Sequence, residues 1–349
     1  MAKLTTWHDE EDDLYMLDTT DPLGVLVTTR TVVELGENVW INPQQIERIA
    51  KEWVHMHDDK SMQASSLWDN TYHFFDASPE GSARTVNWML LLDALNFCFW
   101  SAKDEPRWTV YYQGETLNGY WAEAAALKRA VEEGMPLWDA HYLSTITETD
   151  VAHIFQGNET IPLFAQRVAN ARETGRVLLE RYDGQFINAI EQAHYDAPQL
   201  VQLLERDFPS FRDVTTYKDY PIRFLKRAQI CAADLYGAFG GKDWGAFSNI
   251  DQLTIFADYK LPQVLRHYGI LGYHSSLAYR VDNQELIASG SLEEIEIRAC
   301  TVWACELLRR VLQQYGQPTT AADIDQRLWL LGQRAQEMHP YHRTRTIFY

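Results

Sequence analysis

The sequence predicts a mainly α fold, a single compact helical domain over residues 1–349 with minor β-hairpin elements. Apolar residues recur with a helical period along most of the chain, and strand signals are few. No internal repeat, low-complexity linker or clear domain boundary interrupts the 349 residues. A chain of this length is long enough to bury a large core.

The strand signals are confined to two stretches. Leu26–Leu35 is predicted to be a strand. Trp108–Tyr120 is predicted to contain a hairpin, with its turn in the letters QGETLNG. Both are short beside the helical segments, so the β content is expected to be minor.

The first half of the chain contains three clear helix signals. Trp88–Trp100, WMLLLDALNFCFW, is apolar almost all round and is predicted to be a buried helix. Trp121–Glu133 is predicted to be an amphipathic helix that ends at Gly134. Ile161–Arg181 is a longer one with Pro162 in its first turn. Between them, TETD before VAHIF is typical of a helix N-cap.

The second half is predicted to be almost entirely helical. Its strongest helix is Ile222–Phe239, which Gly240 and Gly241 are expected to end. A break is expected at Pro262, because the residue before a proline disfavours helical geometry. The other predicted helices are Phe186–Tyr195, Pro198–Arg206, Asp251–Asp258, Pro262–Tyr268, Leu292–Tyr315 and Ala321–Met338.

Composition and charge exclude several classes of function. The 31 basic and 49 acidic residues give a formal net charge of −18, which argues against non-specific nucleic-acid binding but not against a nucleotide ligand. The four cysteines form no C-x-x-C pair and no signal peptide is recognised, so a reduced, cytoplasmic protein is expected. No apolar run approaches the roughly 20 residues that cross a bilayer, and no membrane association is expected.

No familiar cofactor or metal motif is present. The eleven histidines show no H-E-x-x-H spacing, so no metal is expected. Walker A, G-x-G-x-x-G and G-x-S-x-G motifs are also missing, so neither a cofactor nor Ser-His-Asp chemistry is expected. Any chemistry must come from less familiar groupings of polar residues.

One such grouping is LTIFADYKLPQ, where Asp258 and Lys260 interrupt an apolar stretch. A helix through DQLTIFAD would end near Tyr259, which would place Asp258 near the negative end of the helix dipole. That location is poor for stability, and local rules tend to be broken at functional sites. The sequence therefore leaves two interpretations: a functional carboxylate, or an ion pair with Lys260 or Lys226.

Two helices carry further polar residues. Asp93 and Asn96 are three residues apart and would share a helix face, either for a packing hydrogen bond or for a ligand. In FLKRAQICAADLYGAF, Lys226 shares a stripe with Gln229 and Ala233, whereas Arg227 and Asp234 project elsewhere. The alternatives are a solvated basic face and a pocket in which Lys226 meets a phosphate or carboxylate.

The C-terminal letters HPYHRTRTIFY end in an apolar aromatic segment. Arg343 and Arg345 would face the same way in an extended tail and could clamp an anion. Disordered basic tails are the common alternative, but Ile347–Tyr349 favours a docked tail.

Several of these segments together resemble one family. FLKRAQICAADLYGAF, LTIFADYKLPQVL, SGSLEEIEIRACTVWACELL and HRTRTIFY are similar to the queuosine salvage proteins, the queuosine 5'-phosphate N-glycosylase/hydrolases, and DPLGVLVTTRTVVEL and LNFCFW fit too. The likeness spans about Asp21–Tyr349. It implies hydrolytic release of queuine from queuosine 5'-monophosphate, and an all-helical fold resembling the DNA glycosylases. LPQVLRHYGIL lacks the glycines of their DNA-binding hairpin, so stable nucleic-acid binding is not expected.

The resemblance also implies site residues. Asp258 matches the family's catalytic carboxylate, and Lys226 matches a functional lysine. Cleavage of an N-glycosidic bond builds positive charge on the ribose, so a carboxylate beneath C1' would stabilise it, attack it or orient water. Queuine is a 7-deazaguanine without N7, so more of the catalysis should fall on the sugar cation. Lys226 or Lys260 is expected to lower the pKa of Asp258 and keep it ionised.

The base pocket is expected to combine aromatic residues with polar edges. The candidates are His73 and Phe74 in YHFFD, and Phe247, Ser248, Asn249 and Asp251 in AFSNID. Core aromatics with capping polar residues are the alternative, and Asp251 could simply cap a helix. Asp325 is a further candidate, and the phosphate is expected near Lys226, Arg227 or the Arg343/Arg345 tail.

Two other functions compete with the hydrolase. A queuine or nucleotide carrier would bind without forming product. A glycosylase acting on a base within nucleic acid would show salt-sensitive affinity for DNA or RNA, which the acidic balance disfavours. We expect a cytoplasmic monomer whose partners are the nucleotide substrate and the queuine product.

Overall fold

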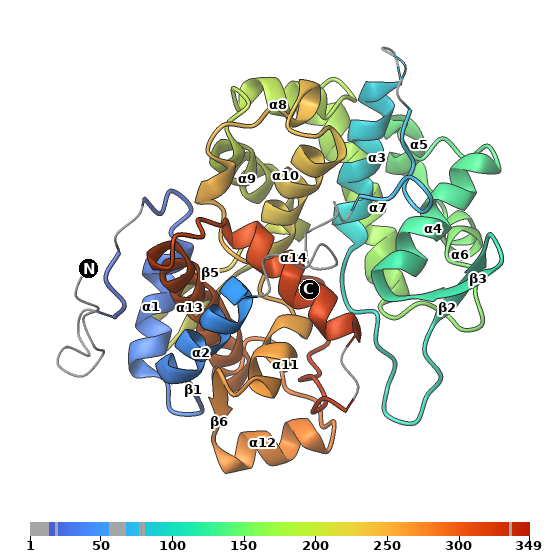
Figure 1. Cartoon of the computed structure of the whole chain (residues 1–349). Coiled ribbons are helices and arrows are strands. Elements are labelled where there is room, and N and C mark those ends of the chain that lie inside the picture. Colours follow the sequence, from blue (N-terminus) through green and yellow to red (C-terminus); the bar gives the residue numbers. More distant parts are fainter. Residues whose placement is uncertain (1–13, 18–19, 56–67, 77, 79–80, 335–336) are drawn as a thin grey trace.

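The computed structural model describes residues 14–17, 20–55, 68–76, 78, 81–334 and 337–349. Within these ranges the fold is mainly α, and the strands form three two-stranded antiparallel sheets (Figure 1). None of the described helices is long and apolar enough to cross a bilayer. The helices are α1 (Val25–Leu35), α2 (Pro43–His55), α3 (Ser82–Leu95), α4 (Gly119–Glu132), α5 (Ala140–Thr145), α6 (Glu148–Ile154), α7 (Phe164–Arg181), α8 (Ile187–Gln192), α9 (Ala197–Asp207), α10 (Lys226–Ala238), α11 (Lys260–His267), α12 (Ser275–Asp282), α13 (Leu292–Gln314) and α14 (Ala321–Arg334).

The three sheets join different parts of the chain. Two are local hairpins, β2 (Thr109–Tyr112) with β3 (Glu115–Asn118), and β4 (Val214–Tyr217) with β5 (Tyr220–Arg223). The third pairs β1 (Val39–Ile41) with β6 (Leu271–Tyr273), so it ties the first part of the chain to the last third.

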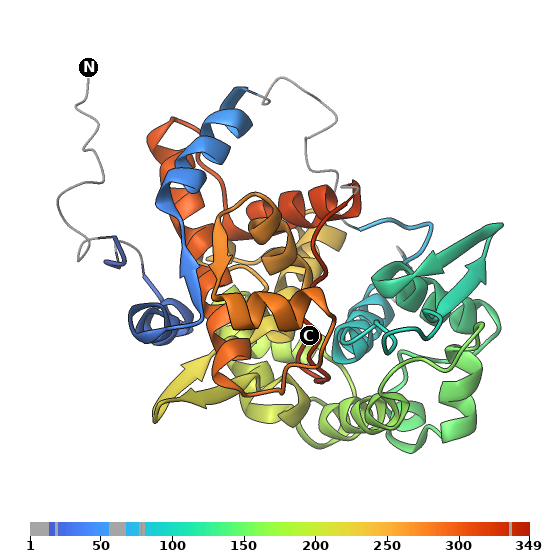
Figure 2. The same cartoon turned by 90° about the horizontal axis from the view of Figure 1, so that it is seen from below.

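Many of the helices gather into two groups on opposite sides of the molecule. In Figures 1 and 2, α1, α2, α11, α12 and α13 lie on one side, and α4, α5, α6 and α7 lie on the other with β2 and β3. The buried helix α3 packs against α7 and α10, and α13 packs against α1 and α2. The C-terminal end of the chain lies between the two groups in both views.

Most of the predicted helices are confirmed. Trp121–Glu133, Pro198–Arg206 and Leu292–Tyr315 match α4, α9 and α13 to within two residues at each end. Thr147 and the side chain of Asp150 form the capping box expected from TETD at the start of α6. The QGETLNG hairpin is confirmed as β2–β3.

The predicted strand at Leu26–Leu35 is wrong, because this stretch forms α1. Its buried side chains, Val25, Leu26, Thr29 and Val32, recur with helical rather than alternating spacing. The hydroxyl of Thr29 donates to the carbonyl of Val25 one turn earlier, which satisfies the polar group inside the helix. Packing against α13 therefore overrides the strand propensity of the β-branched residues.

The helix predicted over Trp88–Trp100 ends early, at Leu95. The buried Arg167 guanidinium donates to the backbone carbonyls of Leu95, Phe97 and Cys98, and these donors replace the hydrogen bonds of a further helical turn. Residues 96–100 consequently run as an irregular segment.

Two other helices begin later than expected, and a third predicted helix is not formed. The helix predicted from Ile161 begins at Phe164, so Pro162 precedes it, and Ile222 belongs to β5 rather than to α10. Asp251–Asp258 is not a helix beyond a single 3-10 turn at Ile250–Gln252. The side-chain Oε1 of Gln229 accepts from the Thr254 backbone N–H at 2.8 Å, and Oδ2 of Asp325 accepts from the Phe256 backbone N–H at 2.8 Å. These side chains hold the segment extended.

Candidate active site

Asp258 lies at the N-terminus of α11, not at the C-terminal end of a helix as its sequence context suggests. Its Oδ1 accepts the backbone N–H groups of Lys260 at 2.7 Å and Leu261 at 2.9 Å. Pro262 occupies the first turn, where its missing N–H costs no helical hydrogen bond. The helix dipole therefore favours the Asp258 carboxylate instead of opposing it.

The Asp258 side chain has one oxygen in use and one available. Oδ2 accepts no hydrogen bond from the described residues, and no ion pair joins Asp258 to a cation among them, so the alternative of an ion pair with Lys260 or Lys226 is not realised. Burial raises the pKa of Asp258, and Lys226, the two backbone N–H groups and Lys260 act against that rise. The lysines thus act in the expected direction, but burial outweighs them.

Lys226 is the first residue of α10. Its backbone N–H donates to Asp213 Oδ2 at 3.2 Å, and Asp213 is in turn held by the Arg298 guanidinium at 2.6 Å and 3.0 Å. Burial lowers the pKa of the Lys226 ammonium, and the Asp258 carboxylate is the largest opposing influence. Lys226 and Asp258 are therefore electrostatic neighbours that both line one cavity.

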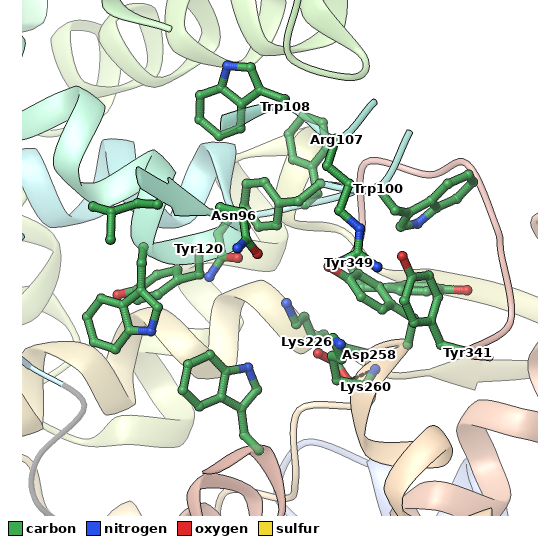
Figure 3. A pocket seen from close by; sticks show the side chains of 18 of the residues that line it. Asn96, Trp100, Arg107, Trp108, Tyr120, Lys226, Asp258, Lys260, Tyr341 and Tyr349 are labelled. Carbon is green, nitrogen blue, oxygen red and sulfur yellow. Dashed lines mark hydrogen bonds between the residues drawn. The ribbon is translucent and has the colours of Figure 1, made fainter. Parts of the chain in front are cut away.

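The cavity has a volume of about 230 Å³. Figure 3 shows Lys226, Asp258 and Lys260 together along one wall, Tyr341, Tyr349 and Trp100 at one end, and Asn96 and Tyr120 toward the other. Aromatic side chains provide most of the remaining lining, from segments far apart in the sequence: Phe97, Phe99, Trp100, Trp108, Tyr120, Trp121, Tyr259, Trp329, Tyr341 and Tyr349.

The end of the cavity near Trp100 is positively charged. Arg107 and Lys260 line it, and the Lys260 ammonium lies 5.1 Å from the centre of the Tyr341 ring. Arg343 and Arg345 both lie over the Trp100 ring, each 5.5 Å from its centre. Arg343 also donates to the Ser101 carbonyl at 3.2 Å, so the two tail arginines support the cavity wall and are not among its lining residues.

The docked tail expected from Ile347–Tyr349 is confirmed at Tyr349, which is 2% exposed and lines the cavity. Its hydroxyl donates to Glu294 Oε1 at 2.8 Å, and its carbonyl oxygen accepts from the Cys98 backbone N–H at 2.9 Å. The Arg298 guanidinium lies 4.4 Å from the ring centre. The same arginine that holds Asp213 beneath Lys226 thus also supports the tail.

The residues proposed for the base lie outside the cavity lining. Phe74 stacks on Trp138 and Phe247 is a core residue. Ser248, Asn249 and Asp251 are exposed. The two aromatics are thus packed in the protein, and the polar residues make other contacts: Ser248 pairs with Asp196 in an isolated bridge and Asn249 donates to the Asp196 carboxylate at 2.5 Å. No side-chain cap is formed at the short 3-10 turn that contains Asp251.

His73 is placed differently, one contact behind the cavity. It is 1% exposed, and its Nε2 lies 2.8 Å from the hydroxyl of the lining residue Tyr120. Burial lowers the pKa of His73 to about 4, so the imidazole is neutral at pH 7. It can position Tyr120 but does not reach the cavity itself.

Arg227 and Asp325 also stand behind the wall. Arg227 is buried and donates to the backbone carbonyls of Asp93, Ala94 and Ser210, so it stabilises the packing of α3 against α10. Burial and the nearby Asp258 raise the pKa of Asp325 well above the ordinary Asp range, and its Oδ2 accepts from the Phe256 backbone. Asp325 thereby holds the segment that leads to Asp258.

Several lining residues escaped the sequence reasoning. For Asn96 the sequence leaves a packing hydrogen bond and a ligand contact open, and the end of α3 at Leu95 turns its side chain into the cavity (Figure 3). No local sequence pattern indicates a functional role for Arg107, Tyr120, Trp329 or Tyr341. They come together only because distant segments of the chain pack against one another in the fold.

Comparison with known proteins shows the family of this chain. The family model described as "Queuosine salvage protein" matches residues 75–349, which include every residue that lines the cavity. A queuosine 5'-phosphate N-glycosylase/hydrolase from Sphaerobacter thermophilus is 49% identical over 96% of this chain and 100% of the relative. Proteins with the same name from Bos taurus and Mus musculus are 34% and 33% identical, over 92% and 94% of this chain and 97% and 99% of their own. The chain belongs to the queuosine salvage protein family.

Proposed function

We propose that this protein hydrolyses the N-glycosidic bond of queuosine 5'-monophosphate and releases queuine for salvage into tRNA modification. The relatives' shared name supports the reaction and substrate. The observation that carries the proposal for this chain is the Asp258 carboxylate, whose Oδ1 is held by two backbone N–H groups while Oδ2 is left for a ligand in the cavity.

The chemistry needs a fixed negative charge beside C1'. As the C1'–N9 bond lengthens, its electron pair moves to the base and positive charge develops on the ribose. A carboxylate that is already oriented by a helix N-terminus stabilises this charge without having to reorganise. This demand is common to nucleophilic attack, water activation and purely electrostatic stabilisation by Asp258. Water supplies the hydroxyl group that C1' gains.

The polarity of the cavity supports one orientation of the nucleotide. Arg107 and Lys260 offer cations for the 5'-phosphate at the end near Trp100. Tyr120, Trp121 and Trp329 offer aromatic surface for the base toward the other end. The ribose then lies between them, beside Asp258 and Lys226. The Lys226 ammonium favours ionised Asp258 and is available to the ribose hydroxyls.

The setting of the reaction belongs to the same proposal. We infer a cytoplasmic monomer that makes no stable contact with nucleic acid. The net charge of −18 supports the absence of stable nucleic-acid binding. The four cysteines are all free and buried, which supports a reducing compartment.

The test is release of free base, followed by chromatography. Purified protein is mixed separately with queuosine 5'-monophosphate, queuosine and GMP, beside the Asp258→Asn variant. We expect queuine from the queuosine compounds only, and only with the wild type. A thermal shift on adding the nucleotide, with no product, would instead establish a carrier and overturn the hydrolase.

A further inference from the structure

One buried guanidinium group contacts both of the segments that carry the charged groups of the site. Arg298 on α13 is 3% exposed, and its Nε donates to the backbone carbonyl of Ala257 at 3.1 Å, directly before Asp258 in the chain. Its two terminal nitrogens donate to Oδ1 and Oδ2 of Asp213 at 3.0 Å and 2.6 Å. All three nitrogens of the guanidinium group therefore hold other segments of the chain.

Asp213 in turn fixes the start of α10. Its backbone carbonyl accepts the N–H groups of Phe224 at 3.0 Å and Leu225 at 3.2 Å, and its Oδ2 accepts that of Lys226 at 3.2 Å. Leu225 has a left-handed backbone with a φ of 52°, which is unfavourable for leucine and persists only where the surroundings enforce it. The point from which the Lys226 side chain enters the cavity thus depends on the contact between Arg298 and Asp213.

The two charged side chains of the site are positioned mainly from behind. The Lys226 ammonium makes no hydrogen bond or ion pair with the described residues, and it lines the cavity together with Asp258 (Figure 3). The guanidinium group behind them is planar and rigid. Two rings pack against it, with the centres of Phe224 and Tyr349 at 3.9 Å and 4.4 Å from Cζ of Arg298. It therefore has little freedom to move.

Resting on the proposed function, we propose that Arg298 is a positioning residue for the hydrolysis, because its single rigid guanidinium group sets the place of Asp258 relative to Lys226. The developing ribose cation needs the carboxylate at a fixed place. Displacement of a catalytic group by about 1 Å costs about a hundredfold in rate. The contribution of Arg298 is therefore expected in the chemical step and not in the binding of the nucleotide.

Arg298→Lys is the variant that tests this role. Lysine keeps a cation beside Asp213 and Glu294, so neither buried carboxylate loses its partner. It lacks the planar fork, however, and cannot contact both Asp213 oxygens and the Ala257 carbonyl together. We expect kcat for queuosine 5'-monophosphate to fall about 30-fold to 100-fold. KM should change much less, because Arg107, the cation proposed for the phosphate, lies on another segment.

The pH–rate profile separates positioning from a loss of folded protein. The groups that face Asp258 are Lys226 on α10, Asp325 on α14, Tyr259 and Lys260 beside it in the chain, and Arg298 on α13 behind the preceding carbonyl. A larger distance from the Lys226 ammonium raises the pKa of Asp258, so the acidic limb of kcat/KM should move to higher pH. Partial unfolding would instead lower the rate by one factor at every pH and leave the midpoint in place.

Lys226→Met provides an internal check. If Arg298 acts by placing Asp258 near the Lys226 ammonium, removal of that ammonium should abolish the shift that Arg298→Lys causes. The midpoint of the double variant should therefore equal that of Lys226→Met alone. A shift that persists in the double variant would show that Arg298 does not act through this pair, and would overturn the inference.

Asp213→Asn is the second variant, so that the inference stays testable if Arg298→Lys does not fold. The amide oxygen can still accept the Lys226 backbone N–H, but the two-point contact with the guanidinium group is lost. This variant should lower kcat and move the acidic limb to higher pH, as Arg298→Lys does.

Arg280→Lys is the control. Arg280 on α12 also donates to a carboxylate, that of Glu293 at 2.9 Å, and to a backbone carbonyl, that of Leu286 at 3.2 Å. It lies outside the cavity lining. This variant should keep the kcat and the midpoint of the wild type, and calorimetric melting of every variant shows that it is folded.

An unchanged kcat in folded Arg298→Lys, or a loss of kcat by one factor at every pH, would overturn the inference. Failure of the hydrolase proposal is recognised separately, because the wild type would then release no queuine. In that case the carboxyl carbon resonance of Asp258, identified by its absence in Asp258→Asn, is titrated by NMR in the wild type and in Arg298→Lys. A higher midpoint in Arg298→Lys upholds the positioning role, and an equal midpoint rejects it.

Discussion

Asp258 Oδ1 accepts the backbone N–H of Lys260 at 2.7 Å, so a carboxylate that appears misplaced in the sequence sits at the favourable end of a helix. This single contact orients the carboxylate and supplies partial positive charge. It also leaves the Lys260 side chain free to line the cavity beside Asp258. One helix terminus thus presents both a carboxylate and an ammonium group to the cavity.

Asp258→Asn is expected to lower kcat for queuosine 5'-monophosphate by about 10³-fold or more, because the neutral amide cannot stabilise the ribose cation. The fold should persist, since Asn also caps helix N-termini well. Asp139→Asn is the control, because the Asp139 side chain also accepts a backbone N–H at a helix N-terminus, that of α5, and lies outside the cavity lining. If both variants hydrolyse the nucleotide at the wild-type rate, Asp258 is not catalytic.

Arg107→Gln is expected to raise KM for the nucleotide about tenfold to a hundredfold, because a cation facing the 5'-phosphate is lost. The KM for the nucleoside, which has no phosphate, should change little. Lys103→Gln is the control, since Lys103 lies in the same exposed loop but outside the cavity. Steady-state kinetics on both substrates measure the difference. Equal effects on nucleotide and nucleoside would place the phosphate elsewhere.

The acidic limb of the pH–rate profile is expected to lie above the ordinary range of an aspartate. Burial raises the pKa of Asp258, and activity that needs the ionised form falls as pH drops through that pKa. Lys226 opposes the rise, so Lys226→Met should move the midpoint of the limb to higher pH, whatever it does to the maximal rate. If the midpoint of the acidic limb of kcat/KM is the same in the wild type and in Lys226→Met, Lys226 does not influence the pKa of Asp258.

Asn96→Ala is expected to raise KM about tenfold, because its amide faces the cavity and is available to the substrate. Ser248→Ala and Asp251→Asn should leave kcat/KM within about twofold, since both residues are exposed and outside the cavity lining. A large loss in either of these two, with Asn96→Ala unaffected, would show that the cavity is not where the base binds.

Tyr349→Phe is expected to lower the melting temperature by about 2–4 °C, because the buried Glu294 loses a hydrogen-bond donor worth about 1–2 kcal/mol. Burial already raises the pKa of Glu294, and removing the hydroxyl should raise it further. The destabilisation should therefore be larger at pH 8 than at pH 5, where Glu294 is more easily protonated. Calorimetry at the two pH values measures this, and an equal shift at both would contradict the ionised role of Glu294.

Local sequence was sufficient for much of the helical framework. The apolar spacing of α4, α9 and α13, the capping letters before α6 and the turn letters of β2–β3 all act within a few residues, so they can be interpreted without the fold. Asp258 also stood out locally, because a charge in an apolar stretch breaks a local rule. Its catalytic role and that of Lys226 came from resemblance to the family and stay predictions.

Tertiary contacts decided the rest. Arg167 ends α3 at Leu95 and turns Asn96 into the cavity, and Gln229 and Asp325 hold residues 253–258 extended so that Asp258 lies just before α11. Each of these donors or acceptors comes from a distant part of the chain, and no local pattern encodes it. The sequence by itself determined most of the helical segments and showed that Asp258 is unusual. Only the tertiary structure decided the sense of the dipole at Asp258, and which arginine, asparagine and aromatic residues share its cavity, because these depend on long-range burial and hydrogen bonding.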